Sequence, residues 1–515
     1  MSARYDRRDF LRTMVAGSAA FMMPSLARAQ DAGDGRPNVL LIMADDMGFS
    51  DIGSYGARII RTPNLDSLAD RGMRFTQFYN NAKCSPTRGS LLTGQYSGWR
   101  GSPSRRVNLA AQMKEVGYRT YMTGKVHGHT TAGFDRSCTM GACASYWNLG
   151  RYQEGPGVLK INGEPHPDFL ETHPDFYATD AWSDYAVRFL DQDRGSDRPF
   201  FLYVAYNAPH YPLHARQEDI EKYRGRFMEG WDVLRRRRFE ALVEAGIVGP
   251  DLRMSPRDED VPSWSSQSRE EKEQWDLWMA TYAAMIDCMD RGIGRILGKI
   301  REQGQEDNTL VFFLSDNGGC AKTGGKPPGS EPGPAGTWHF VGKPWANTSN
   351  TPWRKFKTWD HEGGVSTPLI ACWPERIQPG GFDRDWGHVV DITATCLDVA
   401  GRPNGKILGL PLTPAFDGSR RQLHDVLCWA ILKGKAVREG RWKAVRYEQV
   451  GWNKLGDESY DIGIDDLSKW RLFDMDADRT ELNDLSKQHP ETLRHLVEMW
   501  KAWNEKVSYP GRRPV

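Results

Sequence analysis

The sequence has almost no net charge, because 68 lysines and arginines oppose 67 aspartates and glutamates and leave +1 over 515 residues. A neutral chain has no overall field that would attract nucleic acid or an anionic membrane, so we expect neither as a partner. Long apolar runs are also missing: past the N-terminus none reaches the roughly 18–20 residues of a membrane span, and we expect no span in the mature chain. No internal repeat is visible, and the 52 glycines and 30 prolines are near average usage, which excludes collagen-like chains and repeat arrays.

Cysteine is scarce, with eight residues in the whole chain. This density excludes a fold held together by disulfides, and no two cysteines form the C-x-x-C pair of a zinc site. Cys138 and Cys143 are near enough in sequence to bridge, and two free thiols are an equally weighted alternative. Tryptophan, in contrast, is plentiful at 19 residues, which suits buried aromatic anchors or a surface that stacks on ring-shaped ligands.

The N-terminus carries the pattern of an export signal. Residues 6–12 (DRRDFLR) resemble the twin-arginine motif, a short apolar run follows over residues 14–23, and Ala27-Arg28-Ala29 is an A-x-A-type cleavage site. We predict that residues 1–29 are a signal peptide for the twin-arginine export machinery, and that the mature protein is periplasmic or secreted; a basic N-terminal tail is the alternative. Because this route carries folded proteins, a modification can be completed in the cytoplasm first.

Three continuous apolar segments predict strands that are buried on both faces: residues 38–43, 199–206 and 309–314. Amphipathic helical patterns lie between them, at residues 64–72, 108–116, 177–192 and 275–302. Buried strands that alternate with helices predict the α/β class, with a large, mostly parallel sheet flanked by helices. Such sheets form their sites at the carboxyl ends of strands. Each of these strands is followed there by polar residues: Asp45 and Asp46, Asn207 and His210, Asp316 and Asn317.

The remaining segments complete the predicted organisation. Residues 213–273 are charged and proline-rich, and we interpret the arginine run at residues 235–238 as a solvated helix face. Residues 318–350 are rich in glycine, proline, tryptophan and threonine, which indicates a long ordered loop over a site. Strand-like pieces at residues 427–432, 441–447 and 470–473 precede a helical pattern at residues 490–506. We therefore predict a main domain at residues 37–400, which would hold the site, and a smaller C-terminal α+β subdomain at residues 401–515.

The most specific stretch is residues 83–94, KCSPTRGSLLTG. Cys84, Pro86 and Arg88 with the tail that follows resemble the signature of the type I, formylglycine-dependent sulfatases of the alkaline-phosphatase superfamily. The resemblance implies that a formylglycine-generating maturase oxidises Cys84 to an aldehyde, which hydrates to a gem-diol. The hydrate would attack sulfur, with Arg88 orienting it and Asp316 helping to deprotonate it. A serine would stay sulfated, whereas a gem-diol releases sulfate by collapsing back to the aldehyde.

The resemblance runs from Pro37 to the end of the chain and implies a metal site. Its ligands would be Asp45, Asp46, Asp316 and Asn317, together with the converted Cys84. Carboxylate and amide oxygens suit Ca²⁺, or alternatively Mg²⁺, and do not suit Zn²⁺. The ion would polarise a sulfate oxygen and acidify the gem-diol.

Further motifs supply basic residues. The resemblance assigns Lys125 and His127 through Gly-Lys-x-His, His210 through Asn-Ala-Pro-His, and Lys357 through Lys-x4-Glu-Gly-Gly. It implies that Lys125 binds sulfate, that His210 and Lys357 assist the departing alkoxide, and that His127 takes the proton that lets sulfate leave. A divalent ion with three carboxylates has a charge of about −1, and Arg88 with the two lysines raises it to about +2, complementary to a sulfate ester.

Other segments, at residues 222–227, 282–287 and 361–370, look like those of the large bacterial arylsulfatase subgroup, whose members work largely on sulfated sugars. We therefore predict an enzyme that hydrolyses sulfate monoesters, with a sulfated glycan as substrate. Two departures touch the pocket wall: Val126 stands where the family more often has tryptophan, and the segment after His127 is shortened. Candidate contacts with the leaving group are His129, Trp147, Arg151, His214, Trp338, Trp345 and His361.

Three alternatives stay open at this point. The first is an arylsulfatase acting on aryl sulfates. The second is a phosphonate or phosphate ester hydrolase of the same superfamily, although a two-zinc phosphatase needs a fuller set of His and Asp ligands than the motifs above provide. The third is an inactive exported protein that binds glycans, which would show binding without turnover.

Overall fold

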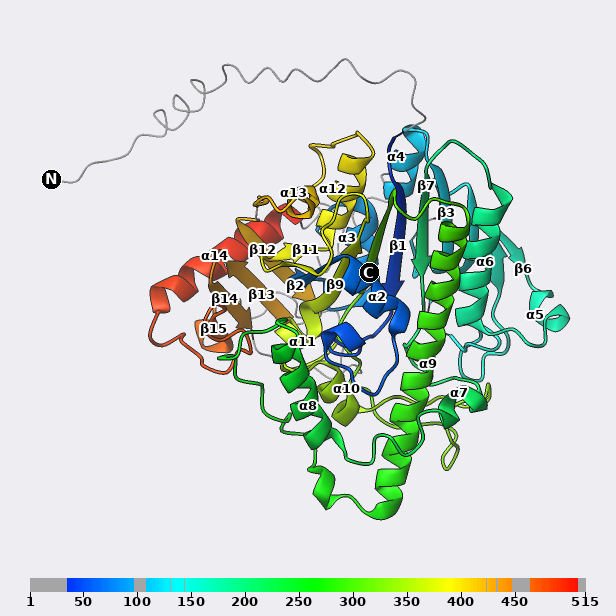
Figure 1. The fold of residues 1–515 in the computed structure, drawn as a ribbon. Coiled ribbons are helices and arrows are strands. Elements are labelled where there is room, and N and C mark those ends of the chain that lie inside the picture. The colour runs from blue at the N-terminus through cyan, green and yellow to red at the C-terminus, as the bar shows by residue number, and fades with distance from the viewer. Residues whose placement is uncertain are drawn as a thin grey trace, which may run out of the picture. The chain divides into compact units, whose positions relative to one another are not determined.

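A central sheet of 11 strands organises the chain, in the order β10-β2-β9-β8-β1-β7-β3-β4-β5-β6 with β11 beside β2 (Figure 1). In its middle β1, β3, β7 and β8 run parallel, whereas β9 is antiparallel to both of its neighbours. The predicted α/β class with a mostly parallel sheet is therefore confirmed. The strands are β1 (Asn38–Ala44), β2 (Met73–Tyr79), β3 (Arg119–Lys125), β4 (Arg136–Met140), β5 (Leu159–Ile161), β6 (Glu164–His166), β7 (Phe200–Ala205), β8 (Thr309–Ser315), β9 (Ser366–Cys372), β10 (Gly381–Asp383) and β11 (Gly387–His388).

The computed structural model describes residues 35–96, 108–129, 131–142, 144–422, 424–431, 434–446 and 464–507. The predicted signal peptide and Cys143 lie outside these residues. Within the described ranges, every helix falls short of the length and apolar character that crossing a membrane requires.

Helices cover both faces of the central sheet, because its strands are apolar on both sides. Along β1, Leu40 and Ile42 pack with α2, α6 and α9, whereas Leu41 and Met43 pack on the other face with α3, α4 and α12. The helices are α2 (Pro63–Arg71), α3 (Cys84–Thr93), α4 (Leu109–Glu115), α5 (Phe169–Thr172), α6 (Ala178–Gln192), α7 (Gln217–Glu221), α8 (Trp231–Glu244), α9 (Arg269–Glu302), α10 (Lys343–Ser349), α11 (Glu362–Val365), α12 (Val390–Val399), α13 (Thr413–Phe416) and α14 (Pro490–Val507), with short 3₁₀ turns η1 (Gly53–Tyr55), η2 (Trp264–Ser266) and η3 (Leu467–Lys469).

A second, antiparallel sheet follows, with the order β12 (Val426–Ile431), β13 (Gly434–Glu439), β14 (Trp442–Arg446) and β15 (Trp470–Asp474). One of its faces packs against α14. The other face packs against Tyr79, Val365 and Trp386 of the main part. The strand and helix types predicted for this region are confirmed, and the domain division at residue 401 stays a prediction.

Helix α9 begins at Arg269, six residues before the predicted start. Ser268 caps it: its side chain accepts a hydrogen bond from the Glu271 N–H, and the Glu271 side chain binds the Ser268 backbone in return. This reciprocal cap starts the helix before its apolar stripe begins. The stripe alone therefore predicts the helix too short.

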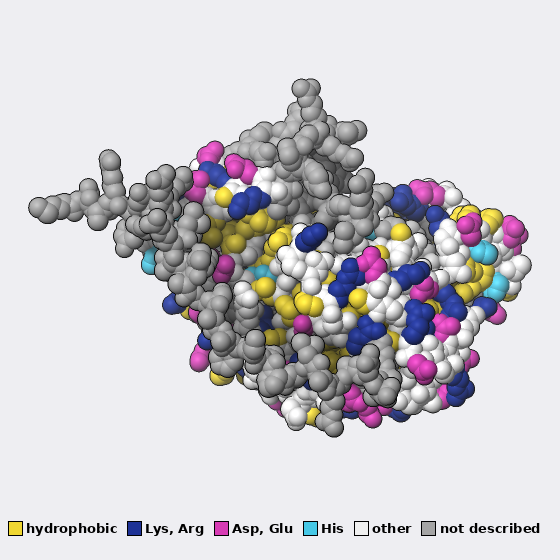
Figure 2. Space-filling view, turned by 90° about the horizontal axis from the view of Figure 1, so that it is seen from above, with side chains coloured by type: hydrophobic (Ala, Val, Ile, Leu, Met, Phe, Trp, Pro, Cys, Tyr) yellow, Lys and Arg dark blue, Asp and Glu magenta, His cyan; other side chains and the backbone are white. Residues whose placement is uncertain are grey.

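The prediction of a solvated arginine face on α8 is half wrong. Arg236 and Arg237 are exposed, but Arg235 and Arg238 are buried. Arg235 donates to the Ser255 hydroxyl at 2.9 Å, so this pair of positions, three residues apart, faces the interior of the protein. On the face shown in Figure 2, acidic and basic side chains are intermixed, as the neutral total predicts.

The segment at residues 318–350 is only partly a loop, because its last residues form α10. Gly342 precedes this helix with a φ of 89°, a conformation that glycine adopts without strain, and Pro344 stands at its first turn. Proline and glycine thus mark the start of a helix here rather than continued loop.

Candidate active site

Charged side chains converge at the carboxyl-terminal edge of the central sheet. Asp45 and Asp46 follow β1, and Asp316 and Asn317 follow the adjacent parallel strand β8. The two pairs therefore lie side by side, and the Asp46 N–H donates to Asp316 Oδ1 at 3.3 Å. Lys125 ends β3 at the same edge.

Helix α3 brings Cys84 to these carboxylates. Cys84 is the first residue of the helix and is only 3% exposed. Burial raises the pKa of its thiol to about 11, with Lys125 and Lys357 opposing the rise. As encoded, Cys84 is thus a neutral thiol at pH 7 and a poor nucleophile.

Arg88 lies one turn further along α3 and is also buried. Its Nη2 and Nε atoms lie 2.8 and 2.9 Å from Asp316 Oδ2, and Nη2 lies 3.7 Å from Asp45 Oδ2. Burial and the nearby Asp45 charge raise the pKa of Asp316 to about 7, against the effect of Arg88. Burial also raises the pKa of Asp45, but Lys125 and the other surrounding cations outweigh it and lower that pKa overall. The adjacent carboxylates therefore differ in proton affinity.

Two buried lysines neutralise the aspartates that follow β1. The Lys125 ammonium pairs with Asp45, and the Lys357 ammonium pairs with Asp46. His210 Nε2 approaches Asp46 Oδ2 at 3.4 Å. All five side chains are nearly inaccessible, so their charges act in a medium that screens them far less than water does.

Three oxygens of this cluster are buried without a hydrogen-bond partner: Asp45 Oδ1, Asp46 Oδ2 and Asn317 Oδ1. The sulfur and carboxylate atoms of Cys84, Asp45 and Asp316 lie within 4.8 Å of one another. Leaving buried oxygens unsatisfied costs free energy, and a hard cation would satisfy them together. The residues present therefore fit a Ca²⁺ or Mg²⁺ ion.

The two histidines differ in their surroundings. His127 follows β3 with a φ of 50°. Burial, followed by the Lys125 charge, lowers the pKa of His127 to about 2, so its imidazole is neutral. Its buried Nδ1 has no hydrogen-bond partner among the described residues, which leaves this atom available as an acceptor. His210 Nδ1 lies 2.5 Å from the Tyr211 carbonyl oxygen. The Tyr211 carbonyl keeps a proton on Nδ1, and Nε2 is directed toward Asp46, with which it forms an ion pair when the ring is protonated.

A close backbone contact holds the loop that carries Lys357 against Asp316 and Asn317. The Lys357 N–H donates to the Gly319 carbonyl at 3.1 Å. A Cβ atom on Gly318 would lie 1.9 Å from the Gly363 carbonyl oxygen. Only glycine permits this approach, which explains why both motifs are glycine-rich.

The residues predicted to contact the leaving group differ in their exposure and in their distance from the cluster. His129 Nε2 lies 2.9 Å from the Ser85 carbonyl, next to Cys84. Trp147 is half-buried, with its ring 4.8 Å from that of Tyr177. Arg151 is exposed, 3.9 Å from Glu154.

The other candidates are buried. His214 accepts from the Tyr146 N–H at 3.3 Å and donates to the Thr337 carbonyl at 2.8 Å. Trp345 is fully buried among other tryptophans, and its indole donates to the Trp275 carbonyl. His361 is the N-cap of α11 and is 1% exposed. Buried side chains already in contact with the protein leave a substrate no accessible surface, so the structure brings His129, and not Trp345 or His214, to the cluster.

Sequence reasoning missed two residues that position Asp46. Tyr282 on α9 donates to Asp51 Oδ2 at 2.8 Å and lies 3.2 Å from the Asp46 carbonyl. Arg238 on α8 pairs with Asp51 at 2.6 Å. The sequence carries no signal for either contact, because Tyr282 stands in an apolar helical pattern and Arg238 in a run of four arginines.

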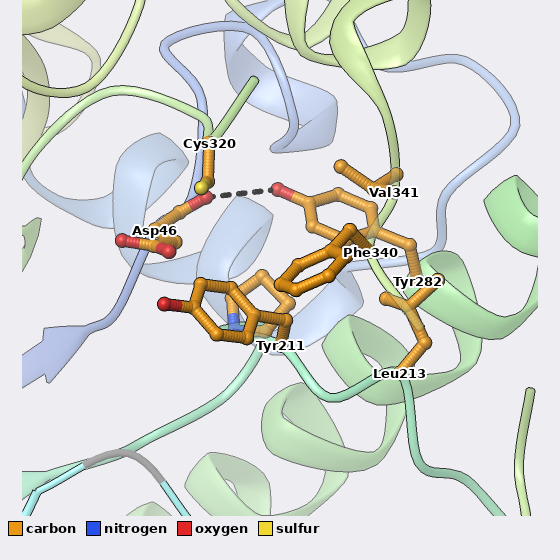
Figure 3. A pocket seen from close by; sticks show the side chains of 8 residues that line it. Asp46, Tyr211, Leu213, Tyr282, Cys320, Phe340 and Val341 are labelled. Carbon is orange, nitrogen blue, oxygen red and sulfur yellow. Dashed lines mark hydrogen bonds between the residues drawn. The ribbon is translucent and has the colours of Figure 1, made fainter. Parts of the chain in front are cut away.

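A small pocket opens beside Asp46 (Figure 3). In this view the rings of Tyr211 and Phe340 lie next to each other, and the Tyr282 hydroxyl points toward the Asp46 backbone. The pocket is lined by Asp46, Pro209, Tyr211, Leu213, Tyr282, Cys320, Phe340 and Val341.

Comparison with known proteins shows what this chain is similar to. A family model described as Sulfatase matches residues 37–402. An uncharacterized sulfatase of Schizosaccharomyces pombe is 30% identical, with 91% of this chain and 93% of that protein covered. The N-acetylglucosamine-6-O-sulfatase of Bacteroides thetaiotaomicron is 25% identical, with 96% and 91% covered. The crystal structure of Ps i-CgsB in complex with k-i-k-neocarrahexaose superposes with a TM-score of 0.67 at 25% identity, covering 92% of this chain and 94% of that one.

Proposed function

This chain belongs to the sulfatase family, whose members are sulfuric ester hydrolases, and we propose that it removes sulfate from sulfated carbohydrates. The observation that carries the proposal is the buried cluster in which Cys84, three carboxylates, the Asn317 amide and four basic side chains meet at one sheet edge. Two relatives support a sugar as the leaving group, since one is named for an N-acetylglucosamine sulfate and the other binds a neocarrahexaose.

The proposal includes conversion of Cys84 to formylglycine by a maturase. The hydrated aldehyde would supply a nucleophile that can release sulfate again, which the neutral thiol cannot do. Cys84 stands at the start of α3, where the side chain faces Asp316 and the lysines rather than the apolar core.

The chain's own residues would then act in three groups. Arg88 and Lys125 hold the negative charge of the sulfate, because both are buried cations fixed by carboxylates. His210 and Lys357, on the Asp46 side, donate a proton to the leaving oxygen. His127, whose buried Nδ1 has no hydrogen-bond partner among the described residues, accepts a proton when sulfate is released.

Asp45, Asp46, Asp316 and Asn317 would hold the metal together with the modified Cys84. When bound, a Ca²⁺ or Mg²⁺ ion would polarise a sulfate oxygen and add positive charge to the site. The oxygens without hydrogen-bond partners support this assignment. Export through the twin-arginine machinery, which would place the enzyme in the periplasm or outside the cell, belongs to the same proposal.

The deciding experiment is mass spectrometry of the peptide that carries Cys84, on protein from its native host. Conversion of a thiol to an aldehyde lowers the mass by about 18 Da, whereas ordinary cysteine oxidation raises it. The converted protein should release sulfate from a panel of sulfated sugars, and Cys84→Ala should abolish this while leaving the circular dichroism spectrum unchanged.

An unconverted cysteine in native protein, or full turnover by Cys84→Ala, would overturn the mechanism. Glycan binding without turnover in the converted protein would favour the inactive glycan-binding alternative. Turnover of 4-nitrophenyl sulfate alone would favour an arylsulfatase, and turnover of phosphonate or phosphate esters alone would favour the other hydrolases of the superfamily.

A further inference from the structure

A group of half-buried aromatic rings and two lysines continues outward from His210. The His210 and Tyr211 ring centroids are 4.1 Å apart. Tyr211 in turn lies 4.6 Å from Phe340 and 6.3 Å from Trp338. We call this group the aromatic–lysine rim; its members are Tyr152, Tyr211, Lys322, Lys326, Trp338 and Phe340.

The rim borders the reaction site directly. Tyr211 and Phe340 line the same pocket as Asp46 (Figure 3). Because His210 and Lys357 contact Asp46, the leaving group of a substrate would depart toward this pocket. The rim therefore lies where the sugar, rather than the sulfate, would be.

Both lysines of the rim are held over aromatic rings. The Lys322 ammonium donates to the Tyr211 hydroxyl at 3.0 Å and lies 5.5 Å from the centre of the Phe340 ring. The Lys326 ammonium lies 5.7 Å from the centre of the Tyr152 ring, and Lys326 is exposed and makes no ion pair among the described residues. Cation–π contacts fix an ammonium without neutralising it, so the rim keeps positive charge.

The backbone of this loop is also fixed. The Lys326 and Trp338 backbones exchange two hydrogen bonds, of 3.1 and 2.8 Å. The Phe340 N–H donates to the Gly324 carbonyl, and the Gly342 N–H donates to the Lys322 carbonyl. This antiparallel ladder positions the rim before any substrate arrives, which lowers the entropy cost of binding.

We propose, on the basis of the proposed function, that the aromatic–lysine rim binds the sugar of the substrate and selects saccharides that carry a second anionic group. Aromatic rings present flat apolar faces on which a pyranose ring can stack. Arg88, Lys125 and Lys357 are already paired at the reaction site, so Lys322 and Lys326 meet a different negative charge. A neutral aryl or monosulfated leaving group would offer no second negative charge to Lys326, which makes no ion pair among the described residues.

Binding is measured by isothermal titration calorimetry on the Cys84→Ala protein, so that no turnover interferes. The probes are pairs of saccharides that differ by one sulfate, such as N-acetylglucosamine 6-sulfate against glucosamine 2-N,6-O-disulfate, with equivalent pairs built on galactosamine and galactose. In at least one pair the disulfated member should bind tenfold or more tightly. Saccharides that carry a carboxylate in place of the second sulfate are measured as well, and they distinguish the two kinds of anion.

Lys322→Met and Lys326→Met test the residues themselves. Together they should reduce the disulfated-to-monosulfated affinity ratio at least tenfold, as should 0.5 M salt. Lys343→Met is the matched control, because Lys343 pairs with Asp260 outside the rim; it should leave the ratio unchanged.

Equal affinities within every pair, or an unchanged ratio in the double variant, would overturn the proposal. These outcomes are distinct from failure of the proposed function, which would appear as converted wild-type protein that hydrolyses no sulfate ester at all. The affinity for the monosulfated member separates selection from structural damage, because loss of the lysine charges alone should leave it unchanged, whereas a misfolded rim would weaken it.

Discussion

Arg88 holds a single oxygen of Asp316 with two nitrogens, Nη2 at 2.8 Å and Nε at 2.9 Å, and both side chains are buried. This pair joins the helix that carries Cys84 to the strand that carries two proposed metal ligands. A lysine has one nitrogen on a flexible chain and cannot reproduce this arrangement.

We therefore predict that Arg88→Gln lowers the free energy of unfolding by about 3–5 kcal/mol, because it leaves a buried carboxylate without its charge partner. Sulfate release should fall below detection, and Arg88→Lys should restore stability in part but not activity. Chemical denaturation measures the first effect. Arg301→Gln is the control: the Arg301 side chain is exposed, and its partner Glu306 keeps a second ion pair with Arg71, so we expect a loss of no more than about 1 kcal/mol. A similar loss in both variants would contradict the assignment.

We predict that Ca²⁺ stabilises the protein through the oxygens that lack hydrogen-bond partners. Adding the ion at 100 times its dissociation constant should raise the free energy of unfolding by about 2.7 kcal/mol, and a chelator should reverse this. Asp45→Asn removes one charge from the site and should weaken Ca²⁺ binding at least tenfold. Asp290→Asn serves as control, because Asp290 is a buried carboxylate of α9 that accepts a hydrogen bond from the Leu65 N–H in the first turn of α2. If neither Ca²⁺ nor Mg²⁺ changes the melting temperature of the protein, the proposed metal site is wrong.

The strand ends predict only part of this cluster, namely Asp45, Asp46, His210, Asp316 and Asn317, because parallel strands bring their carboxyl ends together. Cys84, Arg88 and Lys357 follow from the resemblance of their motifs to those of the family. Apolar runs such as β1 and β8 need no long-range information to be recognised. The residues that hold the cluster in place could not be predicted from the sequence, because their contacts join segments far apart in the chain. Tyr282 contacts Asp46 across 236 residues, and Lys443 contacts Glu362 across 81, on surfaces that only the folded chain defines. The burial of Arg238 could not be predicted either, because a run of four arginines indicates a solvent-exposed helix face unless the pairing of Arg238 with Asp51 is known.

His214 gives the protein a predictable sensitivity to acid. Burial lowers the pKa of His214 to about 4, and its Nδ1 must stay unprotonated to accept the Tyr146 N–H. The unfolded chain takes up this proton near pH 6.5, so the stabilising contribution is complete above pH 6.5 and is lost as the pH falls toward 4. The loss is about 1.4 kcal/mol per pH unit, or about 2 kcal/mol at pH 5.

His214→Gln should remove this part of the slope between pH 6.5 and 4.5 in urea unfolding. His166→Gln, at an exposed position on β6, should leave the slope of the wild type unchanged. If His214→Gln keeps the wild-type slope, the imidazole titrates freely in the folded state and the assigned hydrogen bonds are wrong.

Lys443 on β14 of the second sheet forms an ion pair with the end of the loop that carries Lys357. Its ammonium lies 2.8 Å from Glu362 and 2.9 Å from Glu481, and all three side chains have no exposed surface. Glu362 begins α11, so the ion pair anchors the end of the segment that places Lys357 at Asp46. A second cation, Arg479, binds the other oxygen of Glu362 at 3.0 Å.

We predict that Lys443→Met lowers the free energy of unfolding by about 3–5 kcal/mol, because Glu362 keeps Arg479 but buried Glu481 loses the ion pair that it makes among the described residues. The turnover number should fall with it, since Lys357 loses a fixed support, and Glu362→Gln in the same chain should recover part of the stability. Lys469→Met, an exposed change in the same region, should alter stability by less than about 0.5 kcal/mol. Unfolding of Lys443→Met in one cooperative step, monitored by tryptophan fluorescence and by activity, would mean that the second sheet is part of the structure that supports the site. Two separate steps, with activity retained after the first, would instead mean that residues 401–515 fold as an independent domain and that Lys443 only joins the two.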